Sequence, residues 1–241
     1  MSNCVIEKNT TVNLNDLKYC CCDNNFTLEE ASHAIYICFD DGTNNNTSNK
    51  LVAHLRKDAS LEIYNVVTSS NNSNILQQIY LEESGANVNI MNLFLMTKES
   101  SLDSLIEIFH SDKHTESNLS NYAISKDNAK ITMSNNASIK QGCSKSIAHQ
   151  QAKGLTLSKA SKIKALPNLF IDEYDVVANH ACSIGSINKE DLFYLMSRGL
   201  THEEASKIVV MGYVKPLLDN IKDETLKENI NKEFENKLLN N

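Results

Sequence analysis

The sequence contains only two prolines and seven glycines, and no apolar stretch approaches the roughly 20 residues of a membrane-spanning helix. Its first residues, MSNCVIEKNTTVNLNDL, have neither the basic start nor the apolar core of a secretion signal. Basic residues are also in deficit, because 23 Lys and Arg stand against 30 Asp and Glu, a formal net charge of −7. These absences predict a cytoplasmic protein that binds neither a membrane nor a nucleic acid, since both partners attract concentrated Lys and Arg.

The short motifs of common enzymes are missing as well. There is no G-x-x-x-x-G-K-[ST] phosphate loop, no G-x-G-x-x-G, no G-x-S-x-G and no H-E-x-x-H. Asp172, Glu173 and Asp175 resemble paired carboxylates, but their position before a short apolar run is more typical of a solvated loop. The sequence therefore predicts a protein without catalytic activity of its own.

The cysteines are odd in number and irregular in spacing, which indicates reduced thiols rather than a disulfide framework. The run Cys20-Cys21-Cys22 admits a metal site or a partly buried loop or strand end. The second interpretation is favoured because adjacent cysteines rarely point at one ion and no C-x-x-C pair completes a zinc or cluster site. The seven cysteines are Cys4, Cys20, Cys21, Cys22, Cys38, Cys143 and Cys182.

A short sequence motif recurs within the first 180 residues: an Ala, one or two polar residues, and then alternating apolar positions. It occurs at 59–63, 86–90, 129–133 and 160–165. Period-2 alternation predicts short strands with one buried face. Their repetition between Asn, Ser and Gly turns indicates the stacked coils of a solenoid, with the small residue at a tight corner. Because the spacings are irregular, the residues alone support a two-sheet sandwich almost as well.

Two segments of this region have a mixed pattern. Residues 27–31 (TLEEA) carry a cap-like Thr27 with Glu30 three residues later, which favours the start of a helix. Residues 100–110 (SSLDSLIEIFH) place apolar side chains at helical spacing but fit a strand equally well, and we expect a strand there.

After residue 187 the pattern becomes helical. Asn188 suits the N-cap of a helix over 189–198, and Thr201 with Glu204 forms a capping box for a second helix that reaches residue 213. The expected packed stripe of this second helix consists of Ala205, Ile208, Val209 and Gly212.

Two more helices are predicted beyond this point. Pro216 begins a short one over 217–222, and 224–239 forms an amphipathic surface helix with apolar residues spaced by four. The C-terminal quarter is therefore expected to contain about four helices.

The stretch 165–219 reads ALPNLFIDEYDVVANHACSIGSINKEDLFYLMSRGLTHEEASKIVVMGYVKPLLD. It resembles the end of the SufB/SufD family, the scaffold subunits that help to assemble iron–sulfur clusters. The family phrase is P-x-L-x-[IV], S-H-x-A-x-x-G, L-F-Y-L-x-S-R-G-[IL] and E-E-A, in this order. The matching residues are Pro167, Leu169, Ile171, Asn179, His180, Ser183, Gly185, Leu192, Phe193, Tyr194, Leu195, Ser197, Arg198, Gly199, Leu200, Glu203, Glu204 and Ala205.

This resemblance implies a mainly β fold, a right-handed parallel β-helix over 1–187, followed by a small α-helical domain over 188–241. It also implies a non-catalytic scaffold that pairs with a SufB-like subunit or with a second copy and docks the SufC ATPase. No tightly bound cofactor is expected, only a transient iron–sulfur cluster at a subunit interface. The residues expected to contact the ATPase are Leu192, Phe193, Tyr194, Arg198, Val209 and Tyr213.

His180 is the main candidate for contact with iron. In SufD-like members the matching position is implicated in cluster assembly, and a neutral imidazole can ligate iron or move a proton. The alternative is that His180 only bonds a backbone carbonyl at a strand end. Cys182 is a weaker candidate: in an extended segment its Cα lies about 6.5–7 Å from that of His180 on the same side, but a free buried thiol is favoured.

Two departures from the family separate this chain from SufB-like members. Those carry a cysteine where this sequence has Ala152, and a glutamate directly after the His, where it has Ala181. Since alanine neither accepts sulfur nor binds iron, the chain resembles a SufD-type partner. Two other hypotheses remain open: a redox protein that binds metal alone through His180, Cys182 and Cys143, and a β-solenoid interaction protein unrelated to clusters.

Overall fold

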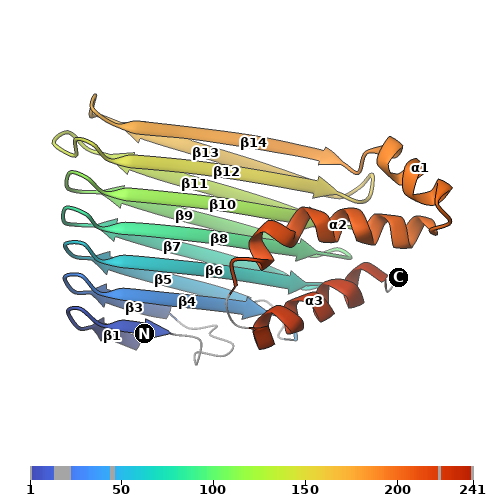
Figure 1. Ribbon diagram of the computed structural model, residues 1–241, viewed down its shortest axis with the longest axis horizontal. Helices are drawn as coiled ribbons and strands as arrows, with labels where there is room; N and C mark the ends of the chain where they lie inside the picture. The colour runs from blue at the N-terminus through green and yellow to red at the C-terminus, as the bar shows by residue number, and fades with distance from the viewer. Residues whose placement is uncertain (1, 14–22, 44–46, 222–223, 240–241) are drawn as a thin grey trace.

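The computed structural model describes residues 2–13, 23–43, 47–221 and 224–239, which form strands followed by helices (Figure 1). The strands are β1 Ser2–Ile6, β2 Thr11–Asn13, β3 Asp23–Leu28, β4 His33–Asp40, β5 Thr47–Leu55, β6 Ser60–Ser69, β7 Ser73–Leu81, β8 Asn87–Met96, β9 Ser101–His110, β10 Glu116–Ser125, β11 Lys130–Ile139, β12 Ile147–Thr156, β13 Lys162–Ile171 and β14 Val177–Ser186. The helices are α1 Lys189–Ser197, α2 His202–Leu218 and α3 Glu224–Leu239.

Consecutive strands alternate between two parallel sheets, so the chain winds as a β-solenoid. Sheet A contains the odd-numbered strands in the order β1-β3-β5-β7-β9-β11-β13, and sheet B contains the even-numbered strands from β14 to β2. Each strand pairs in parallel with the next strand of its own sheet, one coil further along (Figure 1). The expected mainly β solenoid, followed by a C-terminal helical segment, is confirmed.

The coils differ in length, which explains the irregular spacing of the repeated motif. Ser60 of β6 lies beside Asn87 of β8, an advance of 27 residues (60 to 87). Lys130 of β11 lies beside Lys162 of β13, an advance of 32 residues (130 to 162). Four of the five additional residues lie in the turn at 140–146, which has seven residues where the turn at 70–72 has three, and the fifth lies in β12, which has ten residues where β7 has nine.

A small buried residue precedes many of the strands, as the repeated motif predicts. Ala59, Ala86 and Ala129 are completely buried directly before β6, β8 and β11. The prediction is wrong by one residue at the fourth site, where Ser161 occupies the corner before β13 and Ala160 is exposed. A hydroxyl suits this corner because Ser161 Oγ donates to the carbonyl of Ser158 at 2.8 Å and closes the turn.

The two mixed segments are both part of the solenoid. Residues 27–31 do not start a helix: Leu28 ends β3 as a fully buried core residue, and Ala31 has a left-handed φ of 56° in the turn. The period-2 burial of β3 therefore outweighs the cap-like pattern. Residues 101–110 form β9, as expected, because Leu102, Ile106 and Ile108 are buried at strand spacing.

The helical segment has the predicted caps but fewer helices. Asn188 accepts a hydrogen bond from the backbone of Glu190, and Thr201 and Glu204 form the capping box of α2. The break expected at Pro216 is absent, because α2 continues through Pro216 to Leu218. Burial of Leu217 and Leu218 offsets the hydrogen bond that the proline cannot donate. The last predicted helix agrees with α3.

Helices α2 and α3 lie across the outer face of sheet B (Figure 1). The predicted stripe of α2 is confirmed at Ala205, which is buried, but the rest of the buried face consists of Val210, Val214 and Leu217, while Ile208 is half exposed. Val210, Val214 and Leu217 share one apolar cluster with the outward side chains of β6, β8 and β10 and with α3. The helices are thus held on the solenoid by its own strands, and the division at residue 187 into two domains stays a prediction.

The described helices contain no segment both long and apolar enough to span a membrane.

The interior of the solenoid contains a buried histidine. His110, at the end of β9, is completely buried, and its two ring nitrogens lie 2.8 Å from Thr115 Oγ1 and 2.9 Å from Ser117 Oγ. Burial lowers the pKa of His110 from its ordinary value of 6.5 to about 4. The imidazole is therefore neutral in the folded protein at neutral pH.

This histidine predicts a loss of stability in weak acid. Its pKa is lower in the folded than in the unfolded chain, so the unfolded chain binds the proton first, and stability present above pH 6.5 is lost as the pH falls toward 4. The slope contributed by this residue is at most about 1.4 kcal/mol per pH unit. Urea unfolding of wild type and His110→Gln at pH 7 and pH 5 measures it: the gap between the two proteins should narrow at pH 5. An unchanged gap would show that His110 does not titrate in this way.

Candidate functional site at the open end of the solenoid

The last coil of the solenoid, β13 and β14, has no further strand above it among the described residues (Figure 1). Both strands contain ten residues, and nearly all their side chains are exposed or half exposed. Each presents a row of backbone N–H and C=O groups that no strand of the described chain pairs with. A long unpaired edge of this kind is a template for pairing with another chain.

The two edges differ in how readily they accept a strand. β13 carries Lys162 and Lys164 and contains Pro167, which has no N–H to donate. Charges and proline are the features that block edge pairing. β14, with the sequence VANHACSIGS, contains no Asp, Glu, Lys or Arg. The unblocked edge is therefore that of β14.

Both predicted metal candidates lie on the inner face of β14. His180 is in register with Gln150, and Cys182 with Ala152, and these β12 residues are buried between the sheets. His180 and Cys182 thus point the same way, as expected for positions i and i+2 of a strand, but both are exposed because no coil covers them. The favoured interpretation of Cys182 as a buried thiol is wrong, since the thiol is exposed.

The backbone N–H groups of His180 and Cys182 face the open edge of β14. The N–H of Val177 donates to Ser146 O at 3.0 Å, on the β12 side. In a parallel strand alternate residues bond to opposite neighbours, so the N–H groups of Ala178, His180, Cys182 and Ile184 face outward. A strand added at this edge would bond next to the imidazole and the thiol.

Unsatisfied polar groups lie directly beneath this end. Gln150 Oε1, one coil below His180, is buried and has no hydrogen-bond partner in the described part of the chain. Both side-chain polar atoms of Asn135, which is in register with Pro167 of β13, are in the same condition. Buried amide groups without partners cost stability. Two amide side chains beneath the last coil therefore carry polar atoms without a partner among the described residues.

Helix α1 lies beyond the end of β14 (Figure 1). Its side chains add exposed apolar groups at this end of the solenoid. None of its residues is buried, Phe193 is 74% exposed and Tyr194 57%, and the Arg198 guanidinium lies 5.3 Å from the centre of the Tyr194 ring. Leu192 is half-buried beside a pocket described below. The other two predicted contact residues, Val209 and Tyr213, are half-buried on α2, where Tyr213 packs edge-on against Tyr122 of β10.

No group of three or more His, Cys, Asp or Glu side chains in the described ranges is arranged to hold a metal ion. His180 and Cys182 would therefore need ligands from elsewhere. Cys143 is buried, and its thiol donates to His110 O at 3.3 Å. Because burial raises the pKa of this thiol, Cys143 does not have the low-pKa thiol of a metal-binding cysteine and is a core residue. The run Cys20-Cys21-Cys22 lies outside the described residues.

The fold and this end surface define a parallel β-solenoid that presents an unpaired strand edge and an exposed helix. Residues 5–213 match the family described as SUF system FeS cluster assembly, SufBD core domain, and the chain belongs to this family. It is 35% identical over 132 residues, 55% of its length, to the iron–sulfur cluster assembly protein SufD of Bacillus subtilis. It is 38% identical over 87 residues, 36% of its length, to an iron–sulfur cluster assembly SufBD family protein of Archaeoglobus fulgidus. Against the SufD protein of Plasmodium falciparum the identity is 27% over 173 residues, 71% of the chain.

These matches cover 30%, 23% and 12% of the three relatives, so the chain spans less than a third of the length of each. The predicted SufB/SufD resemblance is confirmed. Sequence reasoning did not single out Ile184 or the absence of Asp, Glu, Lys and Arg from β14. Both features can be read from the sequence, since residues 177–186 form a run of ten without these residue types. What it could not supply was that this strand lies at an edge.

Proposed function

We propose that the chain is a non-catalytic scaffold of the SUF iron–sulfur cluster assembly system that pairs through β14 with a SufB-like subunit or a second copy. The observation that carries this proposal is the ten-residue uncharged edge of β14 at the open end of the solenoid. Pairing there would satisfy backbone groups, cover the exposed Ile184 and extend the core over the unsatisfied Gln150. Membership of the SufBD core family supports the link to clusters.

In this proposal the nascent cluster is cargo at the subunit interface. His180 lies on the edge strand where the second strand would pair, and its exposed imidazole stands on the inner face at the open end, where ligands from across the interface could reach it. A site divided between two subunits is consistent with the lack of three clustered ligands in the described chain. The site would hold iron only transiently. Imidazole is a ligand of intermediate softness, and the described chain does not supply the four cysteine thiolates that hold iron–sulfur clusters firmly.

Helices α1 and α2, with Val209 and Tyr213 among the contact residues on α2, would dock the SufC-type ATPase. An exposed aromatic pair next to an arginine is the composition found at the centre of protein interfaces. In α1 this group consists of Phe193, Tyr194 and Arg198, which follows directly after the helix. ATP chemistry would belong to the partner because this sequence has no phosphate loop.

The test is co-expression of the full protein with the SufB-type and SufC-type proteins of its own organism, followed by affinity purification. We expect one complex that contains all the components. Recovery of the well-folded protein without either partner would contradict the proposal. Iron and sulfide analysis of the protein purified alone under anaerobic conditions distinguishes the redox alternative, which requires a stoichiometric cluster on this chain.

His180→Ala in the same co-expression should lower the iron and sulfide content of the complex at least about tenfold, the loss expected when a metal contact is removed. The complex itself should still assemble, because the substitution leaves the backbone edge unchanged. His149→Ala is the matched control, since His149 lies on β12 and is half exposed on the opposite face of sheet B. Equal cluster content in wild type and His180→Ala would assign His180 a structural role only.

A further inference from the structure

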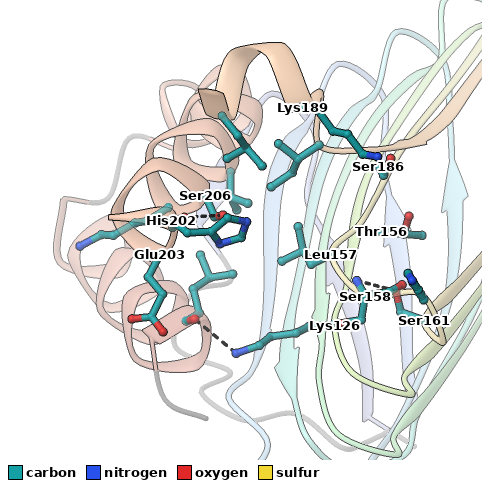
Figure 2. A pocket seen from close by; sticks show the side chains of 16 residues that line it. Lys126, Thr156, Leu157, Ser158, Ser161, Ser186, Lys189, His202, Glu203 and Ser206 are labelled. Carbon is teal, nitrogen blue, oxygen red and sulfur yellow. Dashed lines mark hydrogen bonds between the residues drawn. The ribbon is translucent and has the colours of Figure 1, made fainter. Parts of the chain in front are cut away.

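A cavity of about 730 Å³ lies between the helices and the ends of the last strands (Figure 2). Its walls come from the turn after β10, the end of β12 and the following turn, the end of β14, the start of α1, the first half of α2 and the end of α3. This volume falls in the range of sites for small molecules. The described residues thus contain a half-open cavity that touches β14 only at its last residue, Ser186.

The lining is basic in an acidic protein. Lys126, Lys159, Lys189 and Lys207 line the cavity against a single carboxylate, that of Glu203, while the whole sequence has a net charge of −7. Such a local excess of positive charge raises the concentration of anions at the site.

Two of the four ammonium groups already have partners in the folded chain. Lys207 forms an ion pair with Glu235 at 3.0 Å, and Lys126 Nζ donates to the carbonyl of Leu238 at 3.3 Å, which spans the cavity from the strands to α3 (Figure 2). The ammonium groups of Lys159 and Lys189, which are both exposed, form no ion pair or hydrogen bond with other described residues. Figure 2 shows Lys189 directed along the wall toward Ser186, with the His202 ring extending from α2 toward Leu157. Two free ammonium groups and an imidazole therefore remain for a ligand.

The other part of the lining is apolar. Leu157, Ile187, Leu192, Val210 and Leu238 contribute side chains to the cavity. A purely polar ion such as inorganic phosphate would leave this surface uncovered, whereas an apolar body would bury it. Ser186 and Ser206 also line the cavity, and the Ser206 hydroxyl donates to the carbonyl of His202 at 2.7 Å.

We infer that this cavity binds a small amphipathic anion, with a carboxylate or phosphate headgroup at Lys159 and Lys189 and an apolar body against Leu157, Leu192 and Val210. Both ammonium groups would donate charge-assisted hydrogen bonds to the headgroup. The ligand would bridge the solenoid and the first turns of α1 and α2, and would hold these helices against the strand ends. This inference does not require the proposed scaffold function, although the cavity shares Leu192 with the surface proposed to dock the ATPase.

The test uses the absence of tryptophan from the chain. Leu192→Trp places a single fluorophore in the cavity, and its emission is titrated with octanoate, octyl phosphate, 1-octanol and inorganic phosphate. We expect octanoate or octyl phosphate to bind at least about tenfold more tightly than 1-octanol, the value of one charge-assisted hydrogen bond, and inorganic phosphate to bind weakest. The stronger of the two octyl probes identifies the headgroup class. Calorimetry on the wild-type protein repeats the titration without the substitution.

Charge reversal locates the headgroup. Lys159→Glu/Lys189→Glu should abolish the preference for the charged probes, and it is expected to preserve the fold because both side chains are exposed and Glu is favourable in the first turn of α1. The matched control is Lys113→Glu/Lys140→Glu, two exposed lysines in turns outside the cavity lining, which should leave binding unchanged. Binding of 1-octanol as tight as that of octanoate, equal loss in both double variants, or no binding of any probe by calorimetry would overturn the inference.

Discussion

Replacing Ile184 by Lys should lower the association constant for the pairing subunit at least about 100-fold, or 2.7 kcal/mol. Ile184 lies on the uncharged edge strand β14, its N–H faces the open edge, and its side chain is 40% exposed in the isolated chain. In the paired state the new ammonium group would be covered without a partner, which costs several kcal/mol. The isolated chain should lose little stability, because the lysine can extend into water there.

Sedimentation velocity measures this effect, on the protein alone if it pairs with itself and on its complex with the SufB-like subunit if it does not. Leu166→Lys is the control, since Leu166 has a similar exposure of 37% but lies on β13, the edge that already carries charges and a proline. Equal weakening by both substitutions would indicate that β13 takes part in pairing. No weakening by Ile184→Lys would exclude β14 as the paired edge.

Replacing Asn92 by Ala should reduce the free energy of unfolding by about 2–4 kcal/mol. Asn65, Asn92 and Asn121 are neighbours in register on β6, β8 and β10, and all three are completely buried inside the solenoid. Asn65 Nδ2 donates to Asn92 Oδ1 at 2.8 Å, and Asn92 Nδ2 donates to Asn121 Oδ1 at 2.6 Å. Truncation of the middle residue leaves the acceptor of Asn121 unsatisfied in a medium without water.

Thermal unfolding should show a decrease in Tm of roughly 5–15 °C for this variant. Asn168→Ala is the control: Asn168 Nδ2 also donates to an asparagine, Asn136, at 2.9 Å, but this pair is on the exposed surface of the solenoid. Its loss should change stability by no more than about 0.5 kcal/mol, because water replaces the partner. If both variants lose the same stability, the buried ladder contributes no more than an ordinary surface hydrogen bond.

The asparagine ladder also shows why the core was hard to predict. Asn65, Asn92 and Asn121 lie 27 and 29 residues apart, and in the sequence each is one more polar residue in a chain rich in asparagine. Only stacking of the coils places them in contact, and only then do their amides satisfy each other. A pattern of apolar residues cannot reveal this kind of interior position, because the residue type is the one that usually indicates turns.

Local chemistry determined the features that depend on near neighbours in the chain. Period-2 alternation predicted β9, small residues marked the corners at Ala59 and Ala86, and capping residues fixed the starts of α1 and α2. Where local signals conflicted, as in residues 27–31 and at Pro216, tertiary burial decided the outcome. Leu28 is needed in the core of β3, and Leu217 and Leu218 hold α2 on sheet B beyond the proline.

The amino-acid sequence by itself thus determined the strand type, the helix caps, the family resemblance and the presence of a histidine and a cysteine two residues apart. The tertiary structure alone decided that β14 is the unpaired edge, that His180 and Cys182 are exposed on its inner face, and that lysines from two separate turns and two helices line one cavity. The physical reason is that exposure, register and charge clustering are relations between residues about 30 positions apart or more. These relations exist only once the coils have stacked.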